Sequence, residues 1–453
     1  MWSLISYILL VGVALQLVVF AMLTVSLRRR KQRLPSLPPT GWHMGPVAVQ
    51  DNRLTVYADG TSLYDAMLEA IRGAADEILF ETFIWKDDEV GMAFRDALVE
   101  RAEAGVAVWV TYDTLANVVV PAAFFDLPAP IRVLRYRAWR EWWFAFNPRN
   151  YGRDHRKILV VDRTIGFVGG YNIGTLYRDV WRDTHVRLEG GESLDLAFAF
   201  ADFWHSCAEA HQPRPALPQR PWSPFVRVHR NEPRKLLFPI RAIYVEAIEH
   251  AHRSICMTHA YFIPDPAILA ALKRAAARGV DVRVLVPWES NHLLADWLSR
   301  HLYEECLRSG IRLFLYQGAM IHAKTAVIDG LWTMIGTANM DRLSLAGNYE
   351  INVEVFDADL GVQMERLFER DLANARELTL LEWRAPPRGG RGAAGGGGAP
   401  RGGGGRRGRR RRCCRRCGCS CDARPASCRI AARPRHVILA ACKHNRARSV
   451  TRR

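Results

Sequence analysis

The chain has 453 residues and a formal net charge of +17, which gives it room for two domains and the overall charge of a nucleic-acid binder. Most of that charge lies at one end: from Pro386 onward there are 20 Lys and Arg residues and one acid, so this segment carries +19 and the rest of the chain carries −2. The main part of the chain therefore argues against a nuclease, which would present a basic groove to a phosphate backbone.

The first predicted element is a membrane anchor at residues 3–27, which contain no charged side chain and are rich in Leu, Val and Ile. Five basic residues follow between Arg28 and Arg33, so the positive-inside rule places the amino terminus outside and the rest of the chain in the cytoplasm. A cleaved signal peptide is the alternative, but it normally starts with basic residues and has a shorter apolar core. Residues 28–44 are a basic, proline-containing linker.

Residues 45–211 alternate predicted strands and helices, so they form a first α/β lobe. A helix capped by Thr61 or Ser62 precedes the buried strand ILFETFIW. Later in this lobe an aromatic segment lies beside arginines; its side chains either enter the lipid headgroup region or pack as core. Its aromatic residues are Trp139, Trp142, Trp143, Phe144 and Phe146.

The strongest signal is a repeated motif, DHRKILVVDRTIGFVGGYN from Asp154 to Asn172 and IHAKTAVIDGLWTMIGTAN from Ile321 to Asn339. Both copies alternate like strands, so each histidine is expected to share a face with the lysine two residues later. The spacing of the shared positions is identical. They are His155, Lys157, Asp162, Gly169 and Asn172 in the first copy, and His322, Lys324, Asp329, Gly336 and Asn339 in the second.

These residue types suit the transfer of a phosphate ester. An imidazole can attack phosphorus, and a neighbouring ammonium group neutralises the charge that develops on the phosphate oxygens. The segments Gly169–Gly170 and Gly336–Thr337 would let backbone N–H groups approach an anion, and each asparagine could donate from its amide. A lone His-x-Lys is usually accidental, whereas two copies in register indicate a site.

A carboxylate follows each motif at the same offset: Asp183 follows His155 at the same separation along the chain as Glu350 follows His322. A carboxylate bound to one imidazole nitrogen fixes the tautomer and leaves the other nitrogen free to attack or to transfer a proton. Either residue alone could equally be an ordinary charge at a strand end. The shared offset favours the orienting role.

Residues 225–384 repeat the pattern of the first lobe after a proline-rich linker at 212–224. The segment LKRAAARGVDVRVLVP corresponds to LVERAEAGVAVWVTYD, with Gly279 matching Gly105 at a helix end. We therefore expect two α/β lobes, each a sheet flanked by helices, to face each other across a pseudo-twofold axis. The segment with Trp288, His292 and Trp297 is expected to be a helical apolar stripe; an acceptor pocket is the alternative.

Residues 385–453 are rich in Arg, Gly and Cys and lack hydrophobic periodicity, which predicts disorder. Cys414 and Cys417 have no partner pair at a familiar zinc spacing. The basic segment could bind anionic lipid, but its abrupt composition is also typical of a shifted reading frame. Three further cysteines suit packing in a reducing compartment. They are Cys207, Cys256 and Cys306.

The doubled His-x-Lys-x-x-x-x-Asp motif resembles the signature of the phospholipase D superfamily, and WRDTHVRLEG and GTANMDRLSLAGNYEINVEVFD resemble bacterial cardiolipin synthases. The resemblance implies phosphatidyl transfer between two phosphatidylglycerol molecules through a phosphatidyl-histidine, giving cardiolipin and glycerol without metal or cofactor. It assigns six residues to the catalytic set, although the aspartates are usually structural in this superfamily. They are His155, Lys157, Asp162, His322, Lys324 and Asp329.

The supporting set is Gly169, Gly170, Asn172, Asp183, Gly336, Thr337, Asn339 and Glu350. The family's serine is Gly170 in the first copy, which has no hydroxyl, and Thr337 in the second. The expected partners are phosphatidylglycerol and other phospholipids at a bacterial inner membrane, not nucleic acid. A phospholipase D that uses water as acceptor is the nearest alternative. A non-catalytic lipid-binding scaffold would not need both His-Lys pairs. The sequence does not say which histidine attacks.

Overall fold

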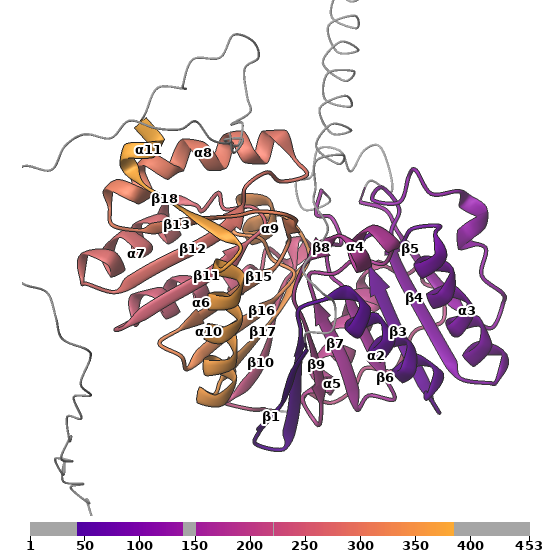
Figure 1. The fold of residues 1–453 in the computed structure, drawn as a ribbon. Coiled ribbons are helices and arrows are strands. Elements are labelled where there is room, and N and C mark those ends of the chain that lie inside the picture. Colours follow the sequence, from indigo (N-terminus) through magenta and orange to yellow (C-terminus); the bar gives the residue numbers. More distant parts are fainter. Residues whose placement is uncertain (1–42, 139–150, 221, 385–453) are drawn as a thin grey trace, which may run out of the picture. The chain divides into compact units, whose positions relative to one another are not determined.

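The computed structural model describes residues 43–138, 151–220 and 222–384, which form two eight-stranded sheets flanked by helices (Figure 1). The strand order is β1-β2-β9-β7-β6-β3-β4-β5 in the first sheet and β10-β17-β16-β15-β11-β12-β13-β18 in the second. The first sheet comprises β1 His43–Val49, β2 Asn52–Tyr57, β3 Glu77–Thr82, β4 Ala107–Asp113, β5 Arg132–Tyr136, β6 Ile158–Val161, β7 Ile165–Gly169 and β9 His185–Glu189. The second comprises β10 Val226–Asn231, β11 Ser254–His259, β12 Asp281–Pro287, β13 Arg312–Tyr316, β15 Lys324–Ile328, β16 Trp332–Gly336, β17 Glu350–Phe356 and β18 Ala375–Leu378.

Seven strands of each sheet share one topology, from β2 to β5 in the first order and from β10 to β13 in the second, which confirms the expected α/β architecture; the edge strands β1 and β18 have no counterpart among the described residues. In each, three neighbouring strands are parallel (β3-β4-β5 and β11-β12-β13), and the motif strands β6 and β15 pair antiparallel with the first of them. Gly105 and Gly279 end the matching helices with φ of 94° and 89°, a conformation that favours glycine. The repeat in the sequence is therefore a repeat of the fold.

The helices cover both sheets and divide the apolar interior into three cores. In the first half they are α2 Gly60–Arg72, α3 Glu89–Glu103, α4 Thr175–Asp179 and α5 Ser193–Cys207. In the second half they are α6 Pro239–Glu249, α7 Pro266–Ala277, α8 Leu293–Arg308, α9 Arg342–Ala346, α10 Ala358–Leu372 and α11 Leu380–Arg384. The first helix begins differently from expectation: Asp59, not Thr61 or Ser62, is the cap, and its carboxylate accepts from Ser62 N at 2.8 Å.

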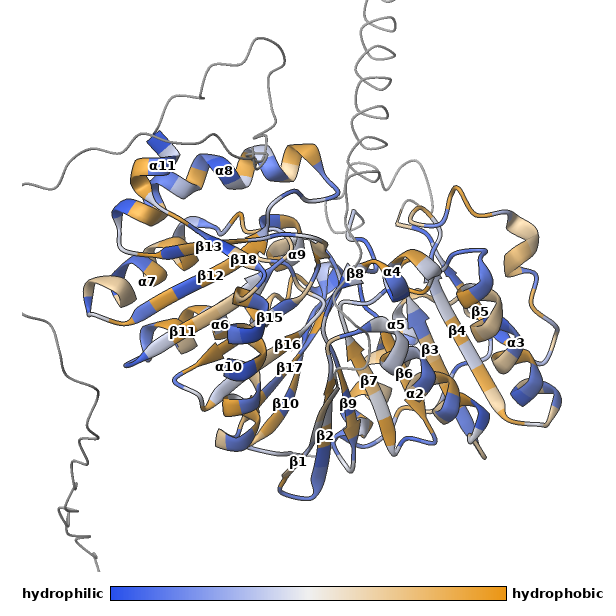
Figure 2. Ribbon diagram, in the orientation of Figure 1, coloured by the Kyte–Doolittle hydropathy of each residue, from blue (hydrophilic) through white to orange (hydrophobic). Residues whose placement is uncertain are grey.

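One of the three cores is shared by the two sheets. It contains Leu196 and Phe200 of α5, Met364 and Phe368 of α10, and inward-facing residues of both sheets. The other two cores lie on the opposite faces, under α2 and α3 in the first half and under α6 and α7 in the second. Figure 2 shows the apolar residues distributed along the strands of both sheets. Burial of apolar surface from both halves in one core fixes the sheets against each other.

Several expectations concern the chain outside the described residues, namely the anchor at 3–27, the aromatic segment at 139–146 and the tail at 385–453. Among residues 43–138, 151–220 and 222–384, no helix has both the length and the apolar character of a membrane span. Cys207, Cys256 and Cys306 are free thiols. Burial raises the pKa of Cys256 and of Cys306 to about 12, which suits packing residues.

The motif aspartates are structural. Asp162 and Asp329 lie in the turns after β6 and β15 with φ of 48° and 56°, at the far end of the strand from each histidine. The Asp329 carboxylate accepts from His252 N, Arg253 N and Ser254 N at 2.8, 2.7 and 2.9 Å. Asp162 accepts in the same way from residues 75–77 at 2.9, 2.8 and 2.9 Å. Each carboxylate thus ties the end of a motif strand to the start of the neighbouring strand.

Replacing Asp329 with Ala should lower the free energy of unfolding by about 1–2 kcal/mol, because three partly exposed hydrogen bonds to a charged acceptor are lost. Asp329→Asn should have a free energy of unfolding between those of the wild type and the Ala variant, because asparagine tolerates positive φ and keeps one acceptor oxygen. Despite burial, the backbone donors lower the pKa of Asp329 in the folded state. The difference between wild type and Ala should therefore shrink as pH falls through that pKa. Urea denaturation across a pH series measures it; an Ala variant as stable as wild type would contradict this role.

Candidate active site

The two histidines lie where the halves of the molecule exchange backbone contacts. His155 N donates to Tyr349 O at 3.1 Å, and Tyr349 N donates to Arg153 O at 2.9 Å. In the other copy His322 N donates to Arg182 O at 2.6 Å, beside the parallel pair of β8 Trp181–Arg182 and β14 Met320–Ile321. Position 182 of the first copy corresponds to 349 of the second, so the two exchanges are equivalent. His155, Lys157 and His322 precede their strands, whereas Lys324 opens β15.

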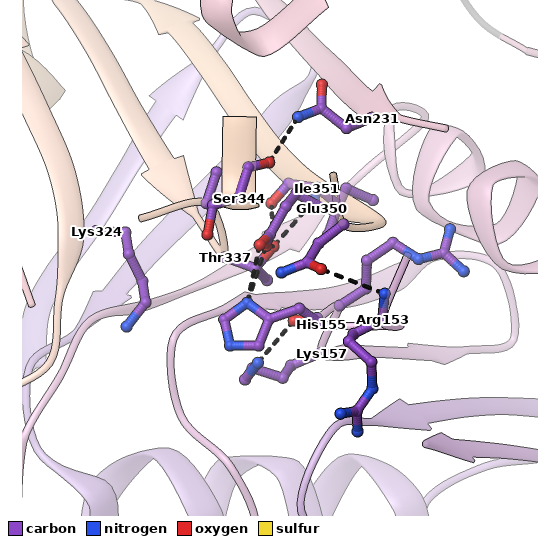
Figure 3. Close-up of polar contacts among 12 residues, drawn as sticks. Arg153, His155, Lys157, Asn231, Lys324, Thr337, Ser344, Glu350 and Ile351 are labelled. Carbon is purple, nitrogen blue, oxygen red and sulfur yellow. Dashed lines mark hydrogen bonds and ion pairs between the residues drawn. The ribbon is translucent and has the colours of Figure 1, made fainter. Parts of the chain in front are cut away.

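Each histidine is held by the carboxylate of the other copy. Nδ1 of His155 lies 3.0 Å from both carboxylate oxygens of Glu350 (Figure 3), and Nδ1 of His322 lies 2.6 Å from Oδ2 of Asp183. The shared offset in the sequence identifies these carboxylates but not this crossing. With Glu350 and Asp183 ionised, we assign the ring proton to Nδ1, which donates to the carboxylate, so Nε2 of each ring carries the lone pair.

The motif lysines lie next to their histidines. Nζ of Lys157 donates to His155 O at 2.6 Å, below the ring in Figure 3. Nζ of Lys324 donates to His322 O and lies 2.8 Å from its Nδ1 and 4.0 Å from Asp183 Oδ2. Since Nδ1 of His322 has the shorter contact with an ionised carboxylate, we assign its proton to that contact. Burial lowers the pKa of Lys157 to about 7 and that of Lys324 to about 8.

Burial also keeps the imidazoles neutral. It lowers the pKa of His322 to about 3 and that of His155 well below its usual value, and the neighbouring lysines lower both further. The carboxylates differ from each other. Burial raises the pKa of Glu350 to about 7, whereas at Asp183 the charge of Lys324 and the hydrogen bonds from His322 and Thr184 N together outweigh burial and lower the pKa. Both rings can therefore offer a neutral Nε2 to an electrophile at neutral pH.

The glycine-rich segments do not form the expected anion cradle. Gly170 N donates to Thr184 O at 3.0 Å and Thr337 N donates to Ile351 O at 2.9 Å, so these N–H groups belong to the sheets. Instead, the absence of a side chain at Gly170 leaves room for the Asp183 carboxylate, because a Cβ at position 170 would overlap it. In the second copy Oγ1 of Thr337 donates to Glu350 at 2.5 Å.

The asparagines also differ between the copies. Oδ1 of Asn172 accepts from Ile84 N at 3.2 Å, whereas the buried Oδ1 of Asn339 has no partner among the described residues. Two aromatic side chains that sequence reasoning missed pack against the imidazoles. Phe83 lies 4.7 Å from His155 and Trp181 lies 4.8 Å from His322, measured between ring centroids. Phe83 was hidden in the apolar segment ILFETFIW, and nothing in the segment WRDTHVRLEG indicated that its Trp181 contacts a histidine of the other copy.

A cavity of about 1060 Å³ adjoins the site, and its lining includes His155 and Asn339. It corrects the expectation for the segment that begins at Trp288: α8 is a helix, but His292 and Trp297 line the cavity while Trp288 packs against the core. Trp297 is 58% exposed. An apolar stripe facing a cavity and one facing a core have the same sequence period, so the pattern could not separate them.

Two lysines lie at the centre of this arrangement beside two neutral nucleophilic nitrogens. Across the described ranges, no group of three or more His, Cys, Asp or Glu side chains is placed to hold a metal ion. The ammonium groups of Lys157 and Lys324 can neutralise a phosphate. The arrangement can therefore bind a phosphodiester, attack it with one imidazole and move a proton with the other.

The fold and site define a phospholipase D-like protein. The structure matches phosphatidylserine synthase from Haemophilus influenzae with a TM-score of 0.57 and 15% identity, over 78% of this chain and 92% of that one. A family profile described as "Cardiolipin synthase, PLD-like domain" matches residues 244–372. Cardiolipin synthase A of Pseudomonas putida is 33% identical over 73% of this chain and 70% of its own length. The major cardiolipin synthase ClsA of Bacillus subtilis is 30% identical over 75% and 73%. The chain belongs to the cardiolipin synthase family.

The contact between position 170 and Asp183 can be tested by a double-mutant cycle. Gly170→Ser should destabilise the fold by about 1–3 kcal/mol, because the added Cβ displaces the carboxylate from His322. Combining it with Asp183→Glu recreates the pairing of Thr337 with Glu350, so the double variant should be more stable than the sum of the single changes by about 1 kcal/mol or more. Chemical denaturation of all four proteins measures this. Simple additivity would show that the two positions do not interact.

Binding of a tetrahedral oxyanion should take up protons. A doubly charged anion favours the charged form of each lysine, so it raises both pKa values above about 7 and 8. When tungstate binds, the lysines should then take up about one proton at pH 8 and much less at pH 6, where they are already charged, in addition to any proton that an imidazole takes up. Calorimetry in buffers of different ionisation enthalpy measures the total uptake. Lys324→Met should reduce the uptake at pH 8 more than the uptake at pH 6, and an equal reduction at both pH values would contradict the assignment.

Proposed function

We propose that this chain synthesises cardiolipin by transferring a phosphatidyl group from one phosphatidylglycerol to a second, with release of glycerol. The observation that supports the proposal most directly is the crossed pair of His–carboxylate contacts, which leaves two neutral Nε2 atoms beside two lysines. The membership in the cardiolipin synthase family gives the substrate class. The −2 charge outside the basic segment argues against a nucleic-acid substrate.

In the first step, Nε2 of one histidine attacks the phosphorus of the donor lipid. The bond from phosphorus to the glycerol headgroup breaks, and the other histidine gives its proton to the departing oxygen. That histidine takes up the proton from solvent when the substrate binds, because the phosphate charge raises the pKa of an imidazole that is neutral in the free site. The lysines hold the phosphate oxygens, which gain charge in the transition state.

In the second step, a hydroxyl of the second phosphatidylglycerol replaces the histidine. The second histidine, now neutral, removes the hydroxyl proton while the oxygen attacks phosphorus and the phosphorus–nitrogen bond breaks. Cardiolipin leaves and both imidazoles return to their initial state. Glu350 and Asp183 keep each ring in one tautomer through both steps.

The substrates are membrane lipids, so the site must work at a bilayer. We propose that residues 3–27 anchor the chain in the inner membrane of a bacterium and that the lobes at 45–211 and 225–384, related by a pseudo-twofold axis, lie on the cytoplasmic side. The uncharged stretch followed by basic residues supports this arrangement. The matched relatives named above are both bacterial proteins.

Lipid mass spectrometry on detergent-solubilised protein given phosphatidylglycerol alone tests the function. Wild type should produce cardiolipin and free glycerol, and His155→Ala and His322→Ala should each lose at least about 10³-fold in rate because the two histidines act in one sequence. His250→Ala, a change on an exposed helix end, is the matched control and should retain full activity. Phosphatidic acid without cardiolipin would make the protein a hydrolase, and substantial turnover in either variant would exclude the two-histidine mechanism.

A further inference from the structure

The cavity beside His155 continues well beyond the residues that the chemistry needs. Its lining follows α7 and α8 as far as Lys273 and Glu305, which pair at 2.8 Å. The walls between His155 and this pair are largely apolar, and so they would not hydrogen-bond a sugar or a glycerol headgroup. They include Ile263, Leu269, Ala270, Ala295, Leu298 and Leu302.

The cavity belongs to one half of the molecule. Among the described residues, its only lining residues from the first half are Phe83 and His155. The helix α8 lies between β12 and β13, whereas the described chain between the matching strands β4 and β5 has only the short 3-10 helix Ala122–Phe125. The lining includes His155 and does not include His322. An otherwise duplicated site therefore has an apolar extension next to one histidine.

The dimensions suit a lipid chain. The volume of about 1060 Å³ lies at the upper end of the range of roughly 300–1,000 Å³ for small-molecule sites. Along α8 the lining runs from Leu294 to Glu305, which at 1.5 Å per residue covers about 16 Å. One leaflet of a bilayer core is about 15 Å thick, which is the depth that one acyl chain crosses.

The rim of the cavity is apolar and exposed. Leu294 and Trp297 of α8 and Leu343 of α9 are 67%, 58% and 72% exposed, and all three line the cavity. A chain that leaves a bilayer for a protein must avoid water on the way, so an exposed apolar rim is the entrance that it requires. Tryptophan is also the side chain that is enriched where protein meets the membrane interface.

We infer that this cavity binds an acyl chain of the phospholipid whose phosphate lies at His155. The inference rests on the proposed function and adds to it: one of the two lipids is held by its chain as well as by its phosphate. The two substrates are then distinguished by the half of the molecule that receives them.

Filling the cavity tests the inference. Ala295→Phe and Ala270→Phe each add an apolar ring to the wall. Each should lower kcat/KM for dioleoyl-phosphatidylglycerol at least tenfold. For dihexanoyl-phosphatidylglycerol each should lower kcat/KM less than twofold, because its chains are too short to extend along α8. Leu331→Phe, an equally apolar change in the exposed turn between β15 and β16, is the control and should alter neither value. An equal loss with both lipids, or no loss with either, overturns the inference.

A second measurement does not need turnover. Phosphatidylglycerol that carries a photoreactive diazirine at the end of one acyl chain should label peptides of α7 and α8 in the wild type, and Ala295→Phe should reduce this labelling at least fivefold. Labelling confined to other peptides overturns the inference. Wild-type protein that is labelled on α8 but makes no cardiolipin from either lipid would instead refute the proposed function, so the two failures are distinguishable.

Discussion

Each histidine of this site depends on the opposite half of the chain. Glu350 holds the ring of His155, Asp183 holds the ring of His322, and the backbone N–H of each histidine donates to the carbonyl just before that carboxylate. A histidine positioned only by its own lobe would keep its lysine but lose the group that fixes its tautomer. The reaction therefore requires both lobes in one fixed arrangement, and the core shared between the sheets provides it.

This arrangement buries charge at the centre of the molecule. Lys324, Asp183 and Glu350 are each at most 1% exposed, and the pKa values of Lys324 and Glu350 move toward their neutral forms. Buried ionisable groups destabilise a fold unless they are paired and hydrogen-bonded, so the site contributes little to stability. The stabilising contribution comes from elsewhere: from apolar residues of α5 and α10 packed between the sheets, and from Asp162 and Asp329, which tie strand ends together away from the reaction.

The sequence predicted the elements of this structure better than their contacts. Identical spacing in the two copies identified the motif residues and the mixed α/β fold, because a repeated pattern of strands and helices must bury the same faces twice. The crossing of Asp183 to His322 was not predictable, since the offset between histidine and carboxylate is the same whether the contact lies within a copy or between copies. The glycine segments misled for a related reason: a residue without a side chain at position 170 suits an anion and a packed carboxylate equally well.

The differences between the two copies matter as much as their similarity. The proposed transfer needs one imidazole that attacks and another that moves protons, and it must receive two lipids in different roles. Two identical halves would bind both lipids alike. In this chain Gly170 packs against Asp183 in one copy, whereas Thr337 donates to Glu350 in the other. The pKa values of these two carboxylates shift in opposite directions. Helix α8 lies between β12 and β13, and the described chain between the matching strands β4 and β5 has no such helix. The repeat supplies paired chemical groups, and the differences between its two copies suit the asymmetric reaction that we propose.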